Sequence, residues 1–326
     1  MHSLDVICLG ELLIDFVSLD RDVSLVDSSG FKKAPGGAPA NVAAGVSRLG
    51  LKAGFIGKVG NDPFGSYLRN VLDNIQVDTK YLIADPDART TLSFVAQKSD
   101  GVRDCMFYRN PGADMLLRPE ELDDGYFEGA AFFHFGSISL GAEPVKSATL
   151  RAIEIAKEKG LLISYDPNLR MSLWPDEETA RREINAGFLF ADVVKISDEE
   201  FGFILGCETP ESCAEAILAM GPKLVVVTLG PKGCFYSDGN HTGYLPTYDD
   251  VTVVETTGAG DAFVASTLAG IITRLKEGDP DALCADESFV RILTFANAAG
   301  SLATTKLGAI PSLPATDEVL AFLAVH

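Results

Sequence analysis

The chain has 326 residues, of which 47% are apolar, and it carries a formal net charge of −19. Nucleic acids and acidic membranes bind basic surfaces, so this charge argues against both as partners. No apolar run approaches the ~20 residues that cross a bilayer. The N-terminus also lacks the basic start and apolar run of a secretion signal. We therefore expect a cytoplasmic protein with a single domain over residues 1–326.

The cysteines are dispersed along the chain without a C-x-x-C pair. The four histidines are equally dispersed, and their spacing completes no zinc site. We therefore expect reduced thiols, most of them buried. The six positions are Cys8, Cys105, Cys207, Cys213, Cys234 and Cys284.

The chain begins with two apolar segments. Residues 4–10 are almost continuously apolar, which is typical of a strand buried on both faces of a parallel sheet. Residues 11–17 follow, and Asp15 stands there among large apolar side chains. Asp15 is either a solvent-facing residue of an edge strand or a ligand contact, and we favour the contact.

A glycine-rich loop leads into the first predicted helix. Gly36 and Gly37 precede a run of small residues that stops at Gly50, which indicates a closely packed helix entered from a flexible loop. Asn41 lies near the start of this helix and offers both a hydrogen-bond donor and an acceptor. These groups suit a polyhydroxylated ligand, although asparagine at a helix start is also a common structural residue.

The following segments alternate strands with helices, and Asp62 and Pro63 mark the start of the next helix. Residues 91–96 and 105–108 interrupt this alternation. They flank a turn signal at residues 99–101 and predict an antiparallel hairpin. An inserted hairpin of this kind could be a lid.

The alternation then becomes regular. It predicts strands at residues 161–165, 192–196 and 224–229, with helices that end near 159 or span 177–190 and 209–220. This order predicts an α/β fold with a doubly wound, mainly parallel sheet flanked by helices. Ligands bind such sheets beyond the carboxyl ends of the strands. The informative segments are therefore those just after the strands, at residues 166–170, 197–200 and 230–233.

Residues 253–263 predict the end of a β-branched strand, a turn of small residues and a helix. The amides of Gly258, Ala259 and Gly260 would lack intrahelical partners and could hold an anion. Asp261 beside them could deprotonate a hydroxyl group as it attacks a phosphate. Taken alone, this segment fits a tight turn with an ordinary helix-start acid equally well.

Other strand-end residues have two readings each. Arg170 could clamp a phosphate or carboxylate, or form a salt bridge with a surface acid. Glu200 could hold waters around Mg²⁺ or belong to a solvated helix face. Gly230 and Gly233 could let the backbone approach a nucleotide, or simply form a turn.

Two nucleotide-binding motifs are absent from the sequence. No G-x-x-x-x-G-K-[ST] segment occurs, so the protein has no P-loop. Residues 258–260 also lack the third glycine and the downstream acid of a dinucleotide fingerprint. This second absence counts against a dehydrogenase.

Residues 36–41 (GGAPAN) and 255–263 (ETTGAGDAF) resemble the two signature motifs of the ribokinase-like (phosphofructokinase B-type) sugar kinases. The resemblance spans essentially the whole chain. Residues 106–116 (MFYRNPGADML), 135–140 (FGSISL) and 195–200 (KISDEE) look most like fructokinases. The resemblance implies a ribokinase-like fold with a small β lid over the sugar, which also serves as a homodimer contact. The lid would comprise segments near 11–35 and 89–115.

The resemblance also implies a reaction and its site. The γ-phosphoryl group of ATP would pass to the 6-hydroxyl of D-fructose, with Mg²⁺ as the cofactor and K⁺ as an activator in some members. Asp261 would be the base, and the amides of residues 258–261 would form the anion hole. The other implied residues are Asp15, Gly36, Gly37, Asn41, Arg109 and Arg170 for the sugar or transferred group; Lys195, Thr228, Gly230, Gly233 and Asn297 for the nucleotide; Glu200 for Mg²⁺ through water; and Glu255, Gly308 and Ser312 for a monovalent cation.

The sequence departs from the family pattern at two positions. Glu255 stands where most members have Asp, at a position tied to the monovalent cation. Ser197 stands where many members have Asn, and fructokinases commonly share this serine. The same chemistry on 2-keto-3-deoxygluconate, ribose or a nucleoside stays an alternative, because a few hydrogen bonds set sugar preference. A non-catalytic sugar sensor on the kinase fold is the alternative from another functional class.

Overall fold

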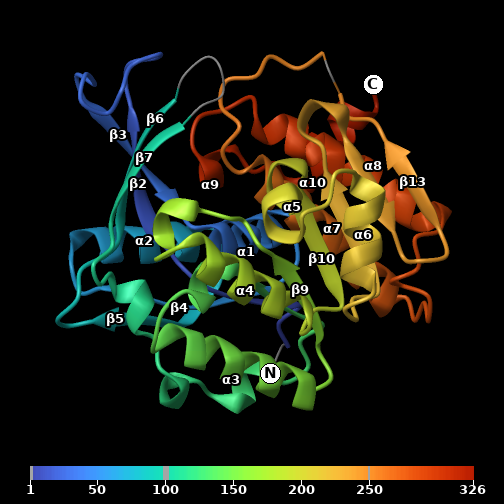
Figure 1. The fold of residues 1–326 in the computed structure, drawn as a ribbon, viewed down its shortest axis with the longest axis horizontal. Coiled ribbons are helices and arrows are strands. Elements are labelled where there is room, and N and C mark those ends of the chain that lie inside the picture. Colours follow the sequence, from blue (N-terminus) through green and yellow to red (C-terminus); the bar gives the residue numbers. More distant parts are fainter. Residues whose placement is uncertain (1–2, 98–102, 249) are drawn as a thin grey trace.

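The centre of the molecule is a mainly parallel β-sheet (Figure 1). The computed structural model describes residues 3–97, 103–248 and 250–326. Within these ranges the sheet has nine strands in the order β13-β12-β11-β10-β9-β8-β1-β4-β5, and the β12 and β13 strands are antiparallel. The strands are β1 (Val6–Leu9), β4 (Ala53–Gly60), β5 (Asp78–Asp85), β8 (Phe132–Gly136), β9 (Leu162–Asp166), β10 (Val193–Ser197), β11 (Leu224–Thr228), β12 (Cys234–Ser237) and β13 (Thr242–Leu245).

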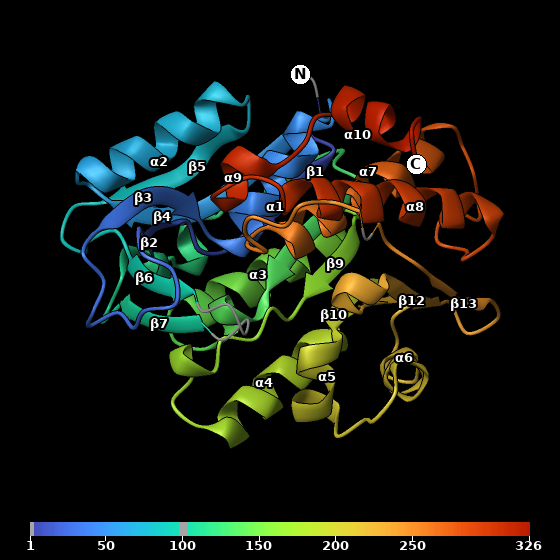
Figure 2. The same cartoon turned by 90° about the horizontal axis from the view of Figure 1, so that it is seen from above.

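Helices cover both faces of this sheet, as Figure 2 shows. The first face packs against α1 (Ala38–Arg48), α2 (Pro63–Asn74), α7 (Ala259–Lys276) and α8 (Glu287–Ala303). The second face packs against α3 (Val145–Glu158), α4 (Glu177–Phe188), α5 (Asp198–Leu205) and α6 (Pro210–Leu218). The remaining helices are α9 (Ala309–Ser312), α10 (Thr316–Leu323) and the 3-10 helices η1 (Ala113–Leu116), η2 (Pro119–Glu121), η3 (Asp124–Phe127), η4 (Ser137–Leu140), η5 (Met171–Leu173) and η6 (Gly230–Lys232).

The continuous apolar character of the central strands follows from this double cover. In β1, Val6 and Cys8 belong to the core on the first face, whereas Ile7 and Leu9 belong to the core on the second. Successive side chains of a strand point to opposite faces, so a strand that is covered on both faces is apolar along most of its length. The chain adds β4 and β5 on one side of β1 and β8 to β11 on the other, which confirms the predicted doubly wound sheet.

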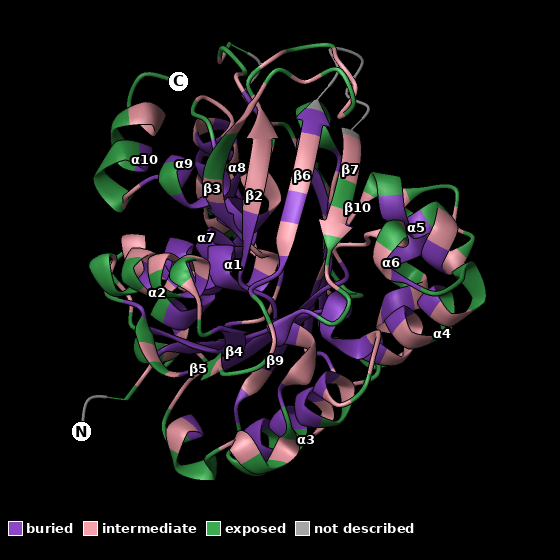
Figure 3. Ribbon diagram, turned by 90° about the vertical axis from the view of Figure 1, so that its left-hand side faces the viewer, coloured by how far each residue is buried: buried purple, intermediate pink, exposed green. Residues whose placement is uncertain are grey.

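A second sheet of four strands stands beside the main body (Figure 3). Its order is β3-β2-β6-β7, and β6 and β7 pair antiparallel, which confirms the predicted hairpin. The expected turn at residues 99–101 lies outside the described residues. That this sheet acts as a lid stays a prediction. Its strands are β2 (Leu13–Ser18), β3 (Phe31–Gly36), β6 (Leu92–Gln97) and β7 (Arg103–Tyr108).

The prediction of a strand just before Gly258 is wrong. Val253 and Val254 have strand propensity, but they lie in irregular structure and Val253 is exposed. The amides of Val254 and Glu255 both donate to the carbonyl of Thr304, at distances of 2.8 and 3.1 Å. The end of α8 thus takes the hydrogen bonds that a neighbouring strand would have used.

Some elements were not anticipated from the sequence, namely α8, α10 and the β12–β13 pair. The helix predicted after the turn of small residues is confirmed as α7, and its Val264, Leu268, Ile271 and Ile272 are buried in the first core. None of the helices in the described part of the chain has both the length and the apolar character needed to cross a bilayer.

Candidate active site

The α7 helix begins at a glycine that no other residue could replace without strain. Gly258 is the N-cap and has a φ of 87°, in the left-handed region. A Cβ atom there would lie 2.9 Å from the Cα atom of Ala309. The amide of Ala259 donates to Thr256 at 3.3 Å, so its prediction as an open donor is wrong. Within the described ranges, the amides of Gly258 and Gly260 meet no acceptor, and their role in an anion hole stays a prediction.

Asp261 lies in the first turn of α7 and is held by a residue of α1. The Nδ2 atom of Asn41 donates to the Oδ2 atom of Asp261 at 2.7 Å, and both side chains are buried. A carboxylate only accepts hydrogen bonds, so this contact fixes which end of the Asn41 amide faces Asp261. The Oδ1 atom of Asn41 is buried and has no partner among the described residues. It is therefore available to a hydroxyl group.

The small residues of α1 allow this contact. A Cβ atom on Gly45 would lie 2.6 Å from the Cβ atom of Ala265, which shows that α1 and α7 touch there. Gly45 lies one turn after Asn41, and Ala265 lies one turn after Asp261. The close approach of the two helices thus brings together the two glycine motifs that the sequence separates.

Lys195 adds a positive charge to the start of α7. It lies on β10, and its Nζ atom is 3.1 Å from the Oδ2 atom of Asp166 at the end of β9. A Cβ atom on Gly260 would be 3.3 Å from the same Nζ atom, so the ammonium group lies against the open amides. Lys195 was placed on the nucleotide side only by resemblance, and the structure brings it beside the predicted anion hole.

Asp166 and Lys195 belong to a buried charged group that also includes Glu200 and Asp261. Burial lowers the pKa of Lys195, but the carboxylates of Asp166 and Glu200 outweigh this effect and raise it. Burial raises the pKa of Asp166, against the opposing effect of Lys195. The carboxylates of Asp166, Glu200 and Asp261 thus all act on the ammonium group of Lys195, beside the predicted anion hole. Asp166 was not among the predicted site residues, although it directly follows a predicted strand.

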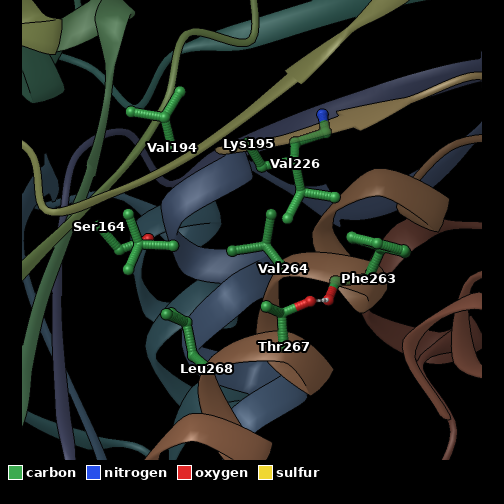
Figure 4. Close-up of a pocket in the computed structure, with 9 residues that line it drawn as sticks. Ser164, Val194, Lys195, Val226, Phe263, Val264, Thr267 and Leu268 are labelled. Carbon is green, nitrogen blue, oxygen red and sulfur yellow. Dashed lines mark hydrogen bonds between the residues drawn. The ribbon is translucent and has the colours of Figure 1, made fainter. Parts of the chain in front are cut away.

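The packing beneath this group is tight. A cavity of about 10 Å³ lies between β10 and the first turns of α7. Lys195, Val264 and Leu268 are among the residues that line it (Figure 4). This volume is at the lower limit for one water molecule. Lys195 and α7 therefore rest on a nearly solid apolar layer, which limits the movement of both.

Glu200 and Arg170 follow neighbouring strands and differ in their contacts. Glu200 is buried, and its Oε2 atom accepts from the amide (3.0 Å) and hydroxyl (2.7 Å) of Ser197. Its Oε1 atom accepts from the amide of Leu169. The reading of Glu200 as a solvated residue is therefore wrong. Arg170 donates to the carbonyl of Leu169 at 2.9 Å, and no carboxylate of the described residues forms an ion pair with it.

The predicted sugar side lies where β2 and β3 meet the start of α1. A Cβ atom on Gly36 would lie 2.1 Å from the Oδ2 atom of Asp15, so the Asp15 carboxylate lies over this glycine. Gly37 has a φ of 114°, and a Cβ atom there would lie 2.3 Å from the carbonyl oxygen of Glu11. Both glycines are thus required by close contacts with the segment around Asp15.

Glu11 is a residue of this region that the sequence reasoning missed. Its Oε1 atom accepts from the amide of Ala38 at 2.8 Å and so caps the start of α1. Burial raises the pKa of Glu11 to about 7, although the hydrogen bonds from backbone amides and the charge of Arg109 lower it. An acid directly after a buried strand was the available signal.

Arg109 is held by a second acid that was missed. Its Nε atom is 2.7 Å from the Oδ2 atom of Asp114, and both side chains are buried. Asp114 also accepts from the hydroxyl of Thr91. A cavity of about 580 Å³ borders Arg109, but neither Asp15 nor Asp261 lines it. Arg109 therefore borders this cavity, and its charge also lowers the pKa of Glu11 at the start of α1.

The four other predicted nucleotide residues surround the ends of β11 and β13. The Thr228 hydroxyl donates to the carbonyl of Ile196 at 3.4 Å. Gly230 is exposed with a φ of 55°. A Cβ atom on Gly233 would lie 2.0 Å from the carbonyl oxygen of Leu245. The Nδ2 atom of Asn297 donates to the carbonyl oxygen of Pro246 at 3.1 Å. Gly233 and Asn297 thus have structural contacts, and their nucleotide contacts stay predictions.

The three residues expected at a monovalent cation lie together. The Oε2 atom of Glu255 accepts from the amide of Gly308 at 2.8 Å, and both residues are buried. Ser312 is fully buried, and its hydroxyl donates to the carbonyl of Ala309 at 2.8 Å. No basic side chain of the described residues pairs with Glu255. A buried carboxylate without a basic partner fits a small cation.

Comparison with known proteins identifies the family to which the chain belongs. Residues 3–316 match the family described as pfkB family carbohydrate kinase. The chain is 49% identical to probable fructokinase-2 of Arabidopsis thaliana, over 98% of this chain and 96% of that protein. The fructokinase of Xylella fastidiosa with bound ATP has a TM-score of 0.88 and 33% identity, with 98% of each chain covered. A fructokinase variant of Vibrio cholerae O395, solved with fructose, ADP and potassium ion bound, has a TM-score of 0.85 and 34% identity, with 99% of each chain covered. The chain therefore belongs to the pfkB family of carbohydrate kinases.

Proposed function

We propose that this protein is a fructokinase that transfers the γ-phosphoryl group of ATP to the 6-hydroxyl of D-fructose. The observation that carries the proposal is the contact between Asn41 and Asp261 at the open amides of α7. In this contact a buried carboxylate and an amide oxygen without a partner among the described residues lie beside the start of α7, which supports an anion site there. The fructokinases of high similarity support the choice of sugar.

Asp261 is the base in this mechanism. Its carboxylate accepts the proton of the sugar hydroxyl as that hydroxyl attacks the γ-phosphoryl group, while Asn41 keeps the carboxylate in place. The amides of Gly258 and Gly260 and the ammonium group of Lys195 stabilise the negative charge on the phosphoryl oxygens. These donors are already oriented before the substrates bind, so no free energy is spent on turning them.

The charged group around Lys195 fits Mg²⁺ as the cofactor. The carboxylates of Asp166, Glu200 and Asp261 all act on the ammonium group of Lys195, so several negative charges lie where a divalent cation would bind. Both oxygens of Glu200 already accept protein hydrogen bonds, so Glu200 would act through water rather than as a direct ligand. When bound with ATP, Mg²⁺ neutralises charge on the phosphate oxygens.

Asp15, Asn41 and Arg109 bind the sugar in this proposal, and Arg170 faces the transferred phosphoryl group. Gly36 and Gly37 leave room for the sugar beside Asp15. The four-stranded sheet closes over the sugar and excludes water, because water would otherwise compete as the acceptor. This sheet is also the homodimer contact, which agrees with the exposed side chains of Met106 and Tyr108 on β7.

Potassium is an activator in this proposal. Glu255, Gly308 and Ser312 hold the ion close to the start of α7, where it strengthens the anion site. Turnover in KCl should therefore exceed turnover in an equal concentration of tetramethylammonium chloride. Equal turnover in the two salts would remove the ion from the mechanism without affecting the assignment of the base.

A coupled assay of ADP release against a panel of sugars tests the proposed function. D-fructose should give the highest kcat/KM, and ³¹P NMR should show fructose 6-phosphate. A higher value for 2-keto-3-deoxygluconate, ribose or a nucleoside would correct the substrate. An absence of turnover with every sugar would indicate a sensor instead of an enzyme.

The base is tested by Asp261→Ala. We expect a loss of at least ~10²-fold in kcat with a normal circular dichroism spectrum. Glu277→Ala is the matched control, because Glu277 is an exposed acid at the other end of the same helix. Turnover by Asp261→Ala that equals turnover by the control would exclude Asp261 as the base.

A further inference from the structure

A second cluster of reactive side chains lies outside the candidate active site. Asp238 and His241 belong to the turn between β12 and β13, and Cys284 belongs to the segment between α7 and α8. The Nδ1 atom of His241 is 3.0 Å from the Oδ2 atom of Asp238 and 3.5 Å from the Sγ atom of Cys284. All three atoms lie within 4.8 Å of one another. The cluster thus brings one nitrogen, one oxygen and one sulfur to a single point.

The geometry of this cluster excludes a catalytic relay from Cys284 through His241 to Asp238. In such a relay, the acid and the nucleophile contact opposite nitrogens of the imidazole ring. Here both contacts are made by Nδ1, so the ring cannot pass a proton from one partner to the other. A single nitrogen also carries at most one proton, and the Cys284 side chain makes a further hydrogen bond directly to Asp238.

A cation at the common point satisfies all three groups. Zn²⁺ binds sulfur at about 2.3 Å and nitrogen or oxygen at about 2.0–2.2 Å, with tetrahedral geometry. These bond lengths place neighbouring ligand atoms roughly 3.3–3.6 Å apart. The observed separations of 3.0 and 3.5 Å are close to these tetrahedral edges. We propose that Asp238, His241 and Cys284 form a Zn²⁺ site, with water as the fourth ligand.

The surrounding backbone holds these ligands in position. The Oδ1 atom of Asp238 accepts from the amides of Asn240 (2.8 Å) and His241 (2.6 Å), and its Oδ2 atom accepts from the amide of Ala285 (2.8 Å). Arg274 donates to the carbonyl of Cys284 at 3.2 Å. Fixed orientation of this kind is what supporting hydrogen bonds give to metal ligands.

The site is accessible and joins two distant parts of the chain. The Asp238 side chain is 7% exposed, whereas the His241 side chain is 53% exposed, so a metal ion can enter past the ring. Cys284 is 43 residues from His241. This separation is why the spacing of histidines and cysteines in the sequence indicated no zinc site. The bound ion joins the turn between β12 and β13 to the segment between α7 and α8, which makes it a structural link rather than a part of phosphoryl transfer.

Titration of the metal-free full-length protein with Co²⁺, a spectroscopic probe for such sites, tests the proposal. Wild-type protein should bind one equivalent and show both a thiolate-to-metal charge-transfer band and the visible bands of tetrahedral Co²⁺. Zn²⁺ should displace these bands at one equivalent and raise the melting temperature. A wild-type protein that shows no charge-transfer band would overturn the proposal.

Matched variants identify the ligands. Cys284→Ser should lose the charge-transfer band and weaken Zn²⁺ binding by more than about tenfold. His241→Ala should weaken binding similarly, and it tests the site independently if Cys284→Ser does not fold. Cys207→Ser is the control, because Cys207 is a partly exposed thiol outside the cluster. The proposal is wrong if Cys284→Ser keeps the band, or if Cys207→Ser loses it.

Discussion

The starts of α1 and α7 are built alike, but the charged group that lies against their amides differs. Gly37 and Gly258 are their N-caps, both have a positive φ, and neither has a side-chain cap of its own. At α1, the Glu11 carboxylate accepts from the amide of Ala38, so an internal acid occupies the helix end. At α7, the Lys195 ammonium group lies against Gly260.

This difference separates two uses of one backbone motif. A helix start with its own acid has no capacity left for a phosphate, and α1 instead presents the Asn41 side chain from its first turn. A helix start with open amides and a neighbouring cation can bind a transferred phosphoryl group. A glycine-rich helix start therefore predicts an anion site only when no internal carboxylate reaches its amides.

The largest expected effect on stability follows from removing Lys195, the cation beside α7. Lys195→Met should lower the free energy of unfolding by about 3–5 kcal/mol, because it leaves the buried Asp166 without its partner. Chemical denaturation measures this loss, and the double variant with Asp166→Asn should recover most of it. Lys223→Met is the control, since Lys223 pairs with Asp192 at the surface and should cost below about 1 kcal/mol. Equal losses for Lys195→Met and Lys223→Met would contradict the importance of the buried pair.

The next largest effect is the pH dependence of the stability that Glu11, the acid beside α1, contributes. The pKa of Glu11 is about 7 in the folded protein, against 4.5 ordinarily, so between these values the folded state keeps a proton that the unfolded state has lost. Stability from this group is therefore complete below pH 4.5 and declines by about 3 kcal/mol as the pH rises to 7. Glu11→Gln cannot ionise and should lack this decline.

Urea denaturation of wild type and Glu11→Gln at several pH values checks this prediction. The stability of the variant relative to wild type should rise between pH 4.5 and 7 and then stay constant. Glu277→Gln, at an exposed position, controls for the loss of one carboxylate. A constant difference between wild type and Glu11→Gln across the whole range would contradict the raised pKa.

A smaller effect is expected from the N-cap of α7. Gly258→Ala should cost about 1–3 kcal/mol, because alanine is strained at this φ and its Cβ would meet Ala309. Gly278→Ala is a matched control at the other end of α7, with a φ of 79° and no atom within 4 Å of the added Cβ. Thermal denaturation should therefore show the larger loss for Gly258→Ala. If both variants lose the same stability, the contact with Ala309 is unimportant.

The smallest effect separates the sugar side from the phosphoryl side. Asp15→Asn should raise the KM for fructose by about tenfold, the equivalent of one hydrogen bond to a charged acceptor. The KM for ATP should stay unchanged, because Asp15 lies over Gly36 at the α1 side of the site. Steady-state kinetics with each substrate varied in turn provides the measurement, and Asp27→Asn, at an exposed position of the β2–β3 connection, is the control. A parallel rise in both KM values would place Asp15 outside the sugar site.

The sequence was most informative where small residues are required by geometry. Gly36, Gly37 and Gly258 could be recognised because close contacts and positive φ values restrict these positions to glycine. The parallel sheet could also be predicted, because strands buried on both faces are continuously apolar. Local pattern and local structure agree in these regions, so the prediction needed no knowledge of distant contacts.

Residues whose role depends on distant partners could not be predicted in the same way. Glu11 caps a helix 27 residues away, and Asp166 pairs with Lys195 across neighbouring strands. Neither contact produces a periodic pattern. The predicted strand at residues 253–254 failed for the same reason, because its hydrogen bonds go to Thr304 at the end of another helix.

The hydrogen bond between Asn41 and Asp261 also constrains when the enzyme can become active during its synthesis. The two residues are 220 positions apart. At about 5–20 residues per second, a ribosome would need roughly 10–45 seconds to add Asp261 after Asn41. Until then a nascent chain has neither the proposed base nor the open amides of α7. If Asp261 is the base, as we propose, an incomplete chain cannot transfer the phosphoryl group, and catalytic competence is acquired only near the end of translation.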